Sequence, residues 1–330
     1  MRSVPPIGVP RSLGVILPTI PWRETPGRRG RTCGSTAGCT TGATDRIRAF
    51  VAEAESAGVA GLWACDHLLW HLPMLEPLTS LAVVATASRT AMVGTCVLQL
   101  PLRHPTVVAR QAATLQVLTG GRFVLGVGVG SHPGEYEAAG SRYDQRGRAL
   151  DHGVGVLHRA WEGRNLGRYR MEPEVSPIPI WIGGSSDQAL ARTARSGDGW
   201  VPLFLPAADY ARARTRLLEL TAGSGRDPAD VATAVVVPMC TGATAESARM
   251  QGTTWLAELY DLPPKAFERH LIAGRAQDCA ASITAYHDAG ASHVIVLVAA
   301  DQALEHLVPV LEALPSTAEP ATTTKLGVAP

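Results

Sequence analysis

An acid, two imidazoles and an indole follow one apolar run in close succession: Asp66, His67, His71 and Trp70. Histidine exchanges its proton most readily near neutral pH, and a neighbouring carboxylate can accept a ring N–H or orient the imidazole. The cluster therefore predicts acid–base chemistry beside a flat ring, with His67 as proton donor or acceptor and Asp66 as its partner. The alternative is a structural cluster at a strand end, in which Asp66 caps a turn.

The spacing of the two histidines argues against a metal centre. His67 and His71 are separated as two ligands on a helix would be, but the sequence places them in a loop after a strand. No third ligand accompanies them. We therefore expect no metal ion.

Two glycine-rich segments could admit a ligand. Gly126, Gly128 and Gly130 alternate along one run, which allows a cofactor or another backbone to approach closely. This run lacks the dinucleotide-binding fingerprint, because the third glycine is one residue early and no helix starts there. The second segment, Gly183-Gly184-Ser185-Ser186, precedes a helical pattern, where free N–H groups favour a phosphate. Tight packing and an ordinary serine-capped turn are the respective alternatives.

Apolar runs that alternate with helical patterns must position these residues. Eight runs are predicted to be strands: Leu13–Leu17, Val59–Cys65, Met92–Leu98, Phe123–Val129, Ile178–Ile182, Trp200–Phe204, Ala232–Pro238 and His293–Val298. They are continuously apolar, as expected of parallel strands covered on both faces. Eight β/α units in one chain predict a (β/α)8 TIM barrel, with a doubly wound sheet as the alternative. In such a barrel the loops after the strands build the active site.

Three segments are longer than ordinary loops, and each follows a predicted strand: Pro18–Ala43, Ser131–Gln145 and Met239–Arg275. We expect them to be insertions after strands 1, 4 and 7, the last with an extra helix within Glu246–Tyr260. Residues 1–314 are predicted to form one domain, because no boundary is evident. The Pro/Thr/Ala-rich segment 315–330 is expected to be a disordered tail.

The composition narrows the class of protein. Of 330 residues, 46% are apolar and 18% are charged, and the formal net charge is +1, so nucleic acid and anionic membranes are poor candidate partners. None of the 6 cysteines forms a C-x-x-C pair, which favours a reducing compartment. No signal-peptide pattern and no long apolar window is present. We expect a cytoplasmic protein that acts on a small-molecule substrate.

Several segments in this order resemble the bacterial luciferase-like family: Gly61-Leu62-Trp63, Asp66-His67, Arg103-His104-Pro105, Gly121-Arg122-Phe123, Pro179–Ser186 and Gly197–Trp200. Within the family the chain most resembles the oxidoreductases that use the deazaflavin coenzyme F420. The resemblance implies a (β/α)8 barrel, usually a homodimer, with the cofactor ring across the carboxyl end of the strands.

The resemblance also implies roles for particular residues. Asp66 and His67 match an Asp-His pair beside the reacting ring, and Cys96–Val97 matches a non-prolyl cis peptide in a bulge that supports the ring. Gly128, Val129 and Gly130, together with Gly183 to Ser186, match segments that line the cofactor and its phosphate. Trp70, His71 and Ser131 match positions that line the substrate pocket.

Three departures from the family pattern bear on the activity. The tryptophan of the sugar-phosphate dehydrogenases falls one residue beyond Trp70, at His71. Ser131 stands where the sugar-phosphate dehydrogenases carry an acid, and Val129 stands where flavin luciferases carry a phosphate-binding arginine. The leading hypothesis is hydride transfer between F420 and a small organic substrate. The alternatives are an FMNH2-dependent monooxygenase and a non-catalytic flavin-binding protein. Arg103 and Arg142 are candidates to meet the anionic oligoglutamate tail of the deazaflavin.

Overall fold

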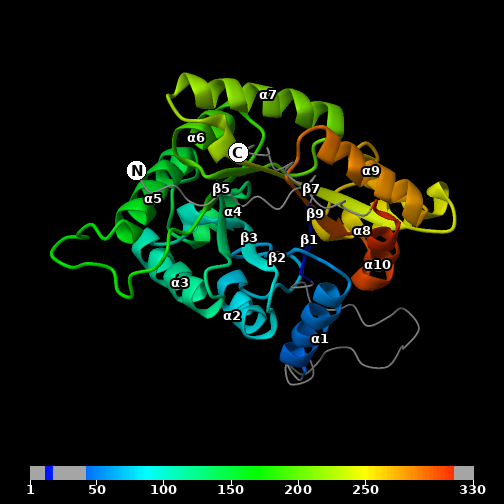
Figure 1. The fold of residues 1–330 in the computed structure, drawn as a ribbon, viewed down its shortest axis with the longest axis horizontal. Coiled ribbons are helices and arrows are strands. Elements are labelled where there is room, and N and C mark those ends of the chain that lie inside the picture. Colours follow the sequence, from blue (N-terminus) through cyan, green and yellow to red (C-terminus); the bar gives the residue numbers. More distant parts are fainter. Residues whose placement is uncertain (1–11, 18–41, 316–330) are drawn as a thin grey trace, which may run out of the picture.

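The computed structural model describes residues 12–17 and 42–315. Among these residues, eight parallel strands form a closed ring in the order β1-β2-β3-β4-β5-β6-β7-β9, and β9 returns to β1. The strands are β1 (Ser12–Ile16), β2 (Gly61–Ala64), β3 (Met92–Gln99), β4 (Phe123–Gly128), β5 (Ile180–Gly183), β6 (Gly199–Val201), β7 (Ala232–Thr241) and β9 (His293–Val298). Figure 1 shows the helices arranged around this ring. The fold is a (β/α)8 TIM barrel, as predicted.

Most of the helices return the chain between the strands and cover the outside of the barrel. They are α1 (Ala43–Ser56), α2 (Pro77–Ala87), α3 (Pro105–Leu118), α4 (Pro133–Ala138), α5 (Arg146–Trp161), α6 (Asp187–Ser196), α7 (Ala207–Gly223), α8 (Ala245–Tyr260), α9 (Ala276–Asp288) and α10 (Ala303–Ala313). Local chemistry sets several of their starts. Ser186 caps α6, and Thr244 and Ser247 form a capping box on α8. Pro77 begins α2, where its missing N–H costs nothing.

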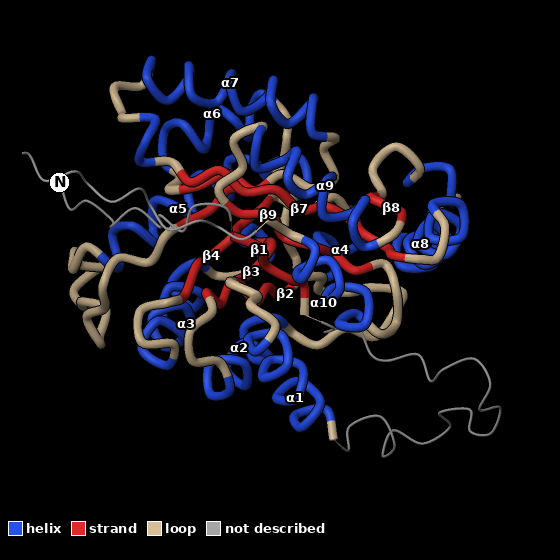
Figure 2. The backbone as a smooth tube through the Cα atoms, turned by 45° about the vertical axis from the view of Figure 1, so that its right-hand side comes forward, coloured by secondary structure: helices blue, strands red, loops and turns tan. Residues whose placement is uncertain are grey.

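All eight predicted strands are present, and the sequence missed one further strand. β8 (Ile272–Gly274) pairs with the end of β7 outside the ring, and Figure 2 shows it beside α8 at the side of the barrel. Its three residues are too few to give an apolar pattern. The insertions after β4 and β7 are confirmed, the first with α4 and the second with α8 and β8.

Three predictions concern residues that lie wholly or largely outside the described ones. They are the insertion after β1, the lack of a signal-peptide pattern at the N-terminus, and the disordered tail 315–330. A long connection that the sequence did not single out joins α5 to β5 over residues 162–179. No helix in segments 12–17 and 42–315 has the length and apolar character needed to cross a membrane.

Both faces of the strands are buried, which explains their continuous apolar character. Along β9, Val294, Val296 and Val298 pack with the helices, whereas Ile295 and Leu297 belong to the cluster inside the barrel. The strand faces therefore alternate between two apolar environments rather than between core and water.

Two tryptophans and one histidine fill a layer inside the barrel. The Trp63 and Trp181 rings stack with their centroids 5.0 Å apart, and Trp63 Nε1 donates a hydrogen bond of 3.0 Å to His293 Nε2. Glycines leave room for them, since a Cβ on Gly14 would lie 2.5 Å from both Trp63 Nε1 and His293 Nε2. Because Nε2 accepts, Nδ1 carries the proton and donates to Ser12 Oγ at 2.6 Å.

We expect this histidine to make the barrel sensitive to acid. Burial lowers the pKa of His293 from 6.5 to about 3, so its unfolded form binds a proton below about pH 6.5 while its folded form does not. Each pH unit in that window should remove up to about 1.4 kcal/mol from the free energy of unfolding. Urea denaturation at pH 7, 6 and 5 measures the slope. His293→Gln, which keeps a donor and an acceptor but cannot titrate, should show a shallower slope, and equal slopes would contradict the assignment.

Candidate active site at the carboxyl end of the barrel

A bulge in β3 supplies an apolar surface at the carboxyl end of the barrel. The register of β3 against β4 shifts between Thr95 and Leu98, and the Cys96–Val97 peptide is cis, as the resemblance implied. The Val97 side chain lies across the ends of β4 and β5. A Cβ would lie 2.6 Å from Val97 Cγ2 at Gly128, and 3.1 Å from Val97 Cγ1 at Gly183. These glycines therefore make room for Val97, which is the packing alternative that the sequence left open.

The Asp66 carboxylate is hydrogen-bonded to two residues, Gln99 at the end of β3 and Arg103 shortly after it. Arg103 Nη1 and Nη2 bind its two oxygens at 2.7 Å and 2.8 Å, and the Gln99 backbone N–H donates to it at 2.8 Å. The Asp66 side chain has 0% exposure, whereas that of Arg103 has 16%. A bidentate arginine pair with an added N–H bond is a strong, geometrically fixed arrangement. Asp66 therefore anchors the loop after β2 and is not bonded to His67.

His67 instead bonds to a residue that the sequence did not single out. Its Nδ1 lies 3.2 Å from Glu135 Oε2 in α4, and its side chain is 20% exposed. The imidazole stacks on Trp70 with ring centroids 3.8 Å apart, and His132 lies edge-on at 5.5 Å. His67 is thus held on two sides near the mouth of the barrel.

Glu135 is itself buried and fully engaged. Its Oε1 accepts the backbone N–H of Leu69 at 3.1 Å and that of Leu68, while Gln99 Nε2 lies 3.3 Å from both carboxylate oxygens. Burial raises the pKa of Glu135, but the hydrogen bonds from Leu69, His67 and Gln99 outweigh it and lower the pKa below its ordinary value. The carboxylate is therefore charged at neutral pH.

Burial and Glu135 act in opposite directions on His67. Burial lowers the pKa of His67 below its ordinary value, and the hydrogen bond and charge of Glu135 raise it only in part. The imidazole is consequently neutral at pH 7 and can accept a proton.

Two tyrosines hold the loop after β4. Tyr136 donates to the carbonyl of Val129, and Tyr143 donates to the carbonyl of Ser131 at 3.2 Å. Between them, Gly130 has a φ of 70°, and a Cβ there would lie 1.9 Å from Gln99 Oε1. That oxygen is buried without a hydrogen-bond partner. Gly130 is therefore required both by its backbone and by the Gln99 amide.

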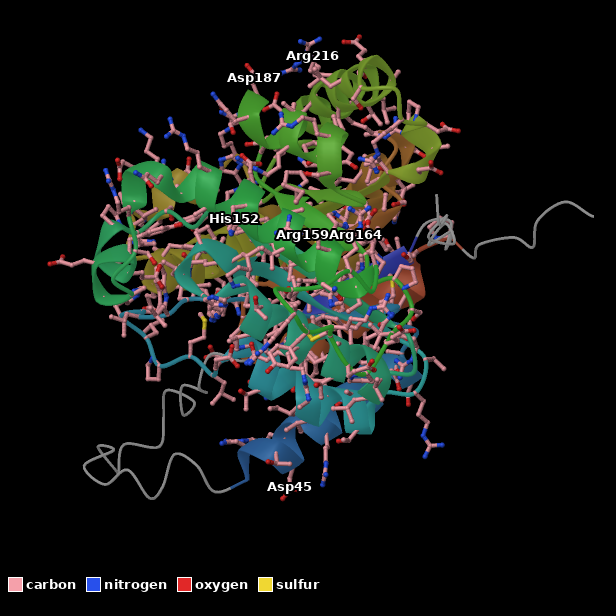
Figure 3. All side chains as sticks on the ribbon, turned by 90° about the vertical axis from the view of Figure 1, so that its left-hand side faces the viewer. Asp45, His152, Arg159, Arg164, Asp187 and Arg216 are labelled. Atoms are coloured by element: carbon pink, nitrogen blue, oxygen red, sulfur yellow. The ribbon has the colours of Figure 1, made fainter. Side chains whose placement is uncertain are left out.

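The segment Gly184–Ser186 is exposed at the end of β5. Trp200 Nε1 donates to the carbonyl of Gly184 at 2.8 Å, and Ser186 Oγ accepts the Ala189 N–H at 3.3 Å as the cap of α6. The segment therefore includes an ordinary serine cap, while the exposed Ser185 remains available to a ligand. Asp187 follows at the start of α6, where its side chain points outward (Figure 3). Its negative charge opposes an anion at this position.

Trp70 and His71 attach the loop after β2 to the insertion after β7. Trp70 Nε1 donates to the carbonyl of Leu259 at 3.1 Å, and His71 Nε2 lies 3.0 Å from the carbonyl of Glu258. Both carbonyls belong to the last turn of α8, where the helix leaves such groups without internal partners. Tyr260 then packs edge-on against Trp70 at 6.3 Å.

The predicted site residues therefore gather at one end of the barrel, with corrected roles for some. Asp66, Val97, Gly128 and Gly183 are linked through β3, and His67 stands beside them on the loop after β2. Arg103 is occupied by the buried Asp66 carboxylate, whereas Arg142 makes only an exposed pair with Asp144 at 2.7 Å, so its contact with an anionic tail stays a prediction. Nowhere in the described chain do three His, Cys, Asp or Glu side chains gather as candidate metal ligands.

The sequence missed Glu135 and Gln99. Glu135 is 68 residues from His67, and Gln99 is 33 residues from Asp66, so local spacing could not connect them. One signal was available: Glu135 is an acid within the predicted insertion after strand 4, and in a barrel such segments carry functional residues.

Comparison with known proteins identifies the family. The family model described as luciferase-like monooxygenase matches residues 29–260. The F420-dependent hydroxymycolic acid dehydrogenase of Mycobacterium tuberculosis (strain ATCC 25618 / H37Rv) is 32% identical over 205 residues, which cover 56% of each chain. The chain spans about half the length of the curated relatives that it matches at this level.

Solved structures of similar fold include enzymes with either cofactor. An F420-dependent secondary alcohol dehydrogenase in complex with an F420-acetone adduct has a TM-score of 0.77 at 14% identity, covering 93% of this chain and 98% of that one. A type II Baeyer-Villiger monooxygenase from Pseudomonas putida in complex with FMN has a TM-score of 0.66 at 16% identity, covering 92% and 95%. These two matches establish the shared fold, and the family model spans most of the sequence. The chain therefore belongs to the luciferase-like monooxygenase family.

Proposed function

We propose that this protein is an oxidoreductase that transfers a hydride between the deazaflavin coenzyme F420 and a small alcohol or ketone. The observation that carries the proposal is the position of His67. Its imidazole lies at the end of β2, 20% exposed, fixed between Glu135 and Trp70, at the same end of the barrel as the β3 bulge. Oxidation of an alcohol releases a proton together with the hydride, and a neutral histidine is suited to accept that proton.

The residues present fit a flat ring with a phosphate-bearing side chain. Val97 offers an apolar surface over Gly128 and Gly183, and the exposed Gly184–Ser186 segment offers N–H and hydroxyl groups. Asp187 weakens the attraction for phosphate without blocking those groups. When bound, the deazaflavin supplies the carbon that accepts or donates the hydride.

The chain's own residues would then orient the substrate and move its proton. His67 would bind the substrate oxygen, taking the hydroxyl proton in the oxidation and returning it to the carbonyl oxygen in the reduction. Asp66 and Arg103 would keep the loop after β2 in place. Trp70, His71 and Ser131, at the rim, would bound the substrate.

The relatives support both halves of the proposal. The 32% identical relative is named for F420 and for the dehydrogenation of a hydroxylated compound, and the dehydrogenase that shares the fold acts on secondary alcohols. Val129, in place of an arginine, favours F420 over FMN, because a lost charge-assisted bond to phosphate costs about 1.5–3 kcal/mol.

A comparison of the two cofactors tests the proposal. We expect the purified protein to bind F420 at least about tenfold more tightly than FMN in fluorescence titrations at one ionic strength. Secondary alcohols or ketones should then change the absorbance of the bound deazaflavin without oxygen uptake. Preference for FMN with oxygen consumption would instead support the monooxygenase. Binding of either cofactor without turnover of any substrate would support a non-catalytic flavin-binding protein.

A further inference from the structure

We propose that Glu135 positions His67 for proton transfer, by holding the proton on Nδ1 and leaving Nε2 to exchange a proton with the substrate. This inference rests on the proposed function, because it assigns a role to His67 in that reaction. Glu135 is a positioning residue in this scheme, since it touches His67 and not the substrate.

The hydrogen bonds of Glu135 determine where the proton lies. Two backbone N–H groups, those of Leu68 and Leu69, and the Gln99 amide all donate to its carboxylate. A carboxylate with three donors is held in its charged form, which can only accept. The contact of 3.2 Å between Glu135 Oε2 and His67 Nδ1 must therefore be an Nδ1–H donor to the carboxylate. A neutral imidazole with its proton on Nδ1 has its lone pair on Nε2.

Asp66 cannot supply this orientation, although it precedes His67 in the sequence. Both of its oxygens are bound by Arg103, and one also accepts the Gln99 backbone N–H. The Gln99 side chain joins the two pairs, because its Nε2 lies 3.1 Å from the Asp66 carbonyl and 3.3 Å from Glu135. The two carboxylates therefore have different roles: Asp66 anchors the loop after β2, and Glu135 orients the His67 ring.

The surroundings of His67 show why the charge of Glu135 matters. Glu135 and His132 face the ring from the segment after β4, and Asp66 with its partner Arg103 lies behind it. Trp70 stacks on the ring, and His71 contacts Trp70 with ring centroids 4.8 Å apart. Burial and His132 disfavour the protonated imidazole, whereas Glu135 favours it most among the neighbours. Removing that charge should make His67 a weaker base.

The two nitrogens of the His67 ring account for the proton in the proposed alcohol oxidation. In alcohol oxidation the C–H bond breaks and its electron pair leaves with the hydride to F420, while the O–H proton passes to Nε2. The imidazolium then carries both protons, and Glu135 stabilises its charge through Nδ1–H, as the buried carboxylate does in catalytic triads. In the reverse reaction Nε2–H returns the proton to the carbonyl oxygen.

The first test uses the unmodified protein without cofactor. In protein labelled with ¹⁵N-histidine, two-bond ¹H–¹⁵N correlations distinguish the two neutral tautomers, and the signal lost in His67→Gln identifies His67. We expect the proton of neutral His67 on Nδ1. A neutral form protonated on Nε2 would overturn the proposal.

The second test is Glu135→Gln, whose amide oxygen can still accept the Leu68 and Leu69 N–H groups. Its NH2 group would face Nδ1 as a donor, so the proton should move to Nε2 and the pKa of His67 should fall by about 1–2 units. Turnover should fall at least about 100-fold, because the lone pair no longer faces the substrate. The matched control is Glu137→Gln, the same change at an exposed position of α4, which should alter neither quantity.

The outcomes separate this proposal from the cofactor assignment. The tautomer and the pKa of His67 are measured without cofactor. Absence of F420 turnover in the unmodified protein would therefore contradict the proposed function, while the effect of Glu135 on the His67 tautomer could still be measured. Loss of turnover in Glu135→Gln with an unchanged tautomer and pKa would reduce Glu135 to a structural residue and refute its positioning role.

Discussion

Replacing His67 by alanine is expected to lower turnover with F420 by about 100- to 10,000-fold. The loss would follow from removing the group proposed to exchange the substrate proton. The affinity for F420 should change little, because the proposed Val97 surface is carried by β3, β4 and β5 and not by the loop that holds His67. Single-turnover rates and fluorescence titration measure the two effects separately.

A matched control is His152→Ala, which removes an exposed imidazole from the outer face of α5 (Figure 3). It should leave turnover unchanged. If His67→Ala retained full turnover, the imidazole would have no part in the chemistry. If it lost F420 binding to the same degree as turnover, His67 would be a binding residue and not an acid–base group.

Replacing Arg103 by methionine is expected to lower the free energy of unfolding by about 3–5 kcal/mol, since it leaves a buried carboxylate without its partner. The Asp66 side chain has no exposed surface, so water cannot replace the guanidinium. Chemical denaturation at pH 7 measures the loss. The double variant with Asp66→Asn should recover part of it, because the buried charge is then removed.

The same change at Arg142 provides the contrast. Arg142 pairs with Asp144 at 2.7 Å, but these side chains are 69% and 65% exposed. Exposed pairs contribute less than about 1 kcal/mol, so Arg142→Met should unfold almost as the unmodified protein does. Equal, small effects at both positions would show that the Asp66–Arg103 pair does not stabilise the fold.

The barrel was predictable because its strands are buried on both faces. The runs that became β4 and β9 are apolar at nearly every position, and the extra helix expected within Glu246–Tyr260 is present as α8. β8 was not predicted, because three residues are too few to show a periodic apolar pattern. α4 escaped because its six residues contain a proline and a glycine, which are more typical of a loop.

The sequence predicted which residues lie at the site, but it did not predict which of them are hydrogen-bonded to one another. The sequence located His67 on the loop after β2 and Val97 in β3, yet it assigned to Asp66 the orienting contact that Glu135 makes. Arg103 lies 37 residues from Asp66 and Glu135 lies 68 residues from His67, so only the closed ring brings them together. Gly128 shows a related limit: its alternation with other glycines fitted a ligand or a packing contact equally, and the position of Val97 was needed to choose.

The attachment of Trp70 and His71 to the last turn of α8 constrains how new substrate ranges can arise in this scaffold. The loop after β2 carries His67, the proposed acid–base residue, and the insertion after β7 is the longer of the two segments. Replacing that insertion alone would remove or displace the two backbone carbonyls that Trp70 and His71 contact beside His67. We therefore expect a chimera to keep the loop after β2 in position best when residues 67–71 and residues 242–275 come from the same parent protein.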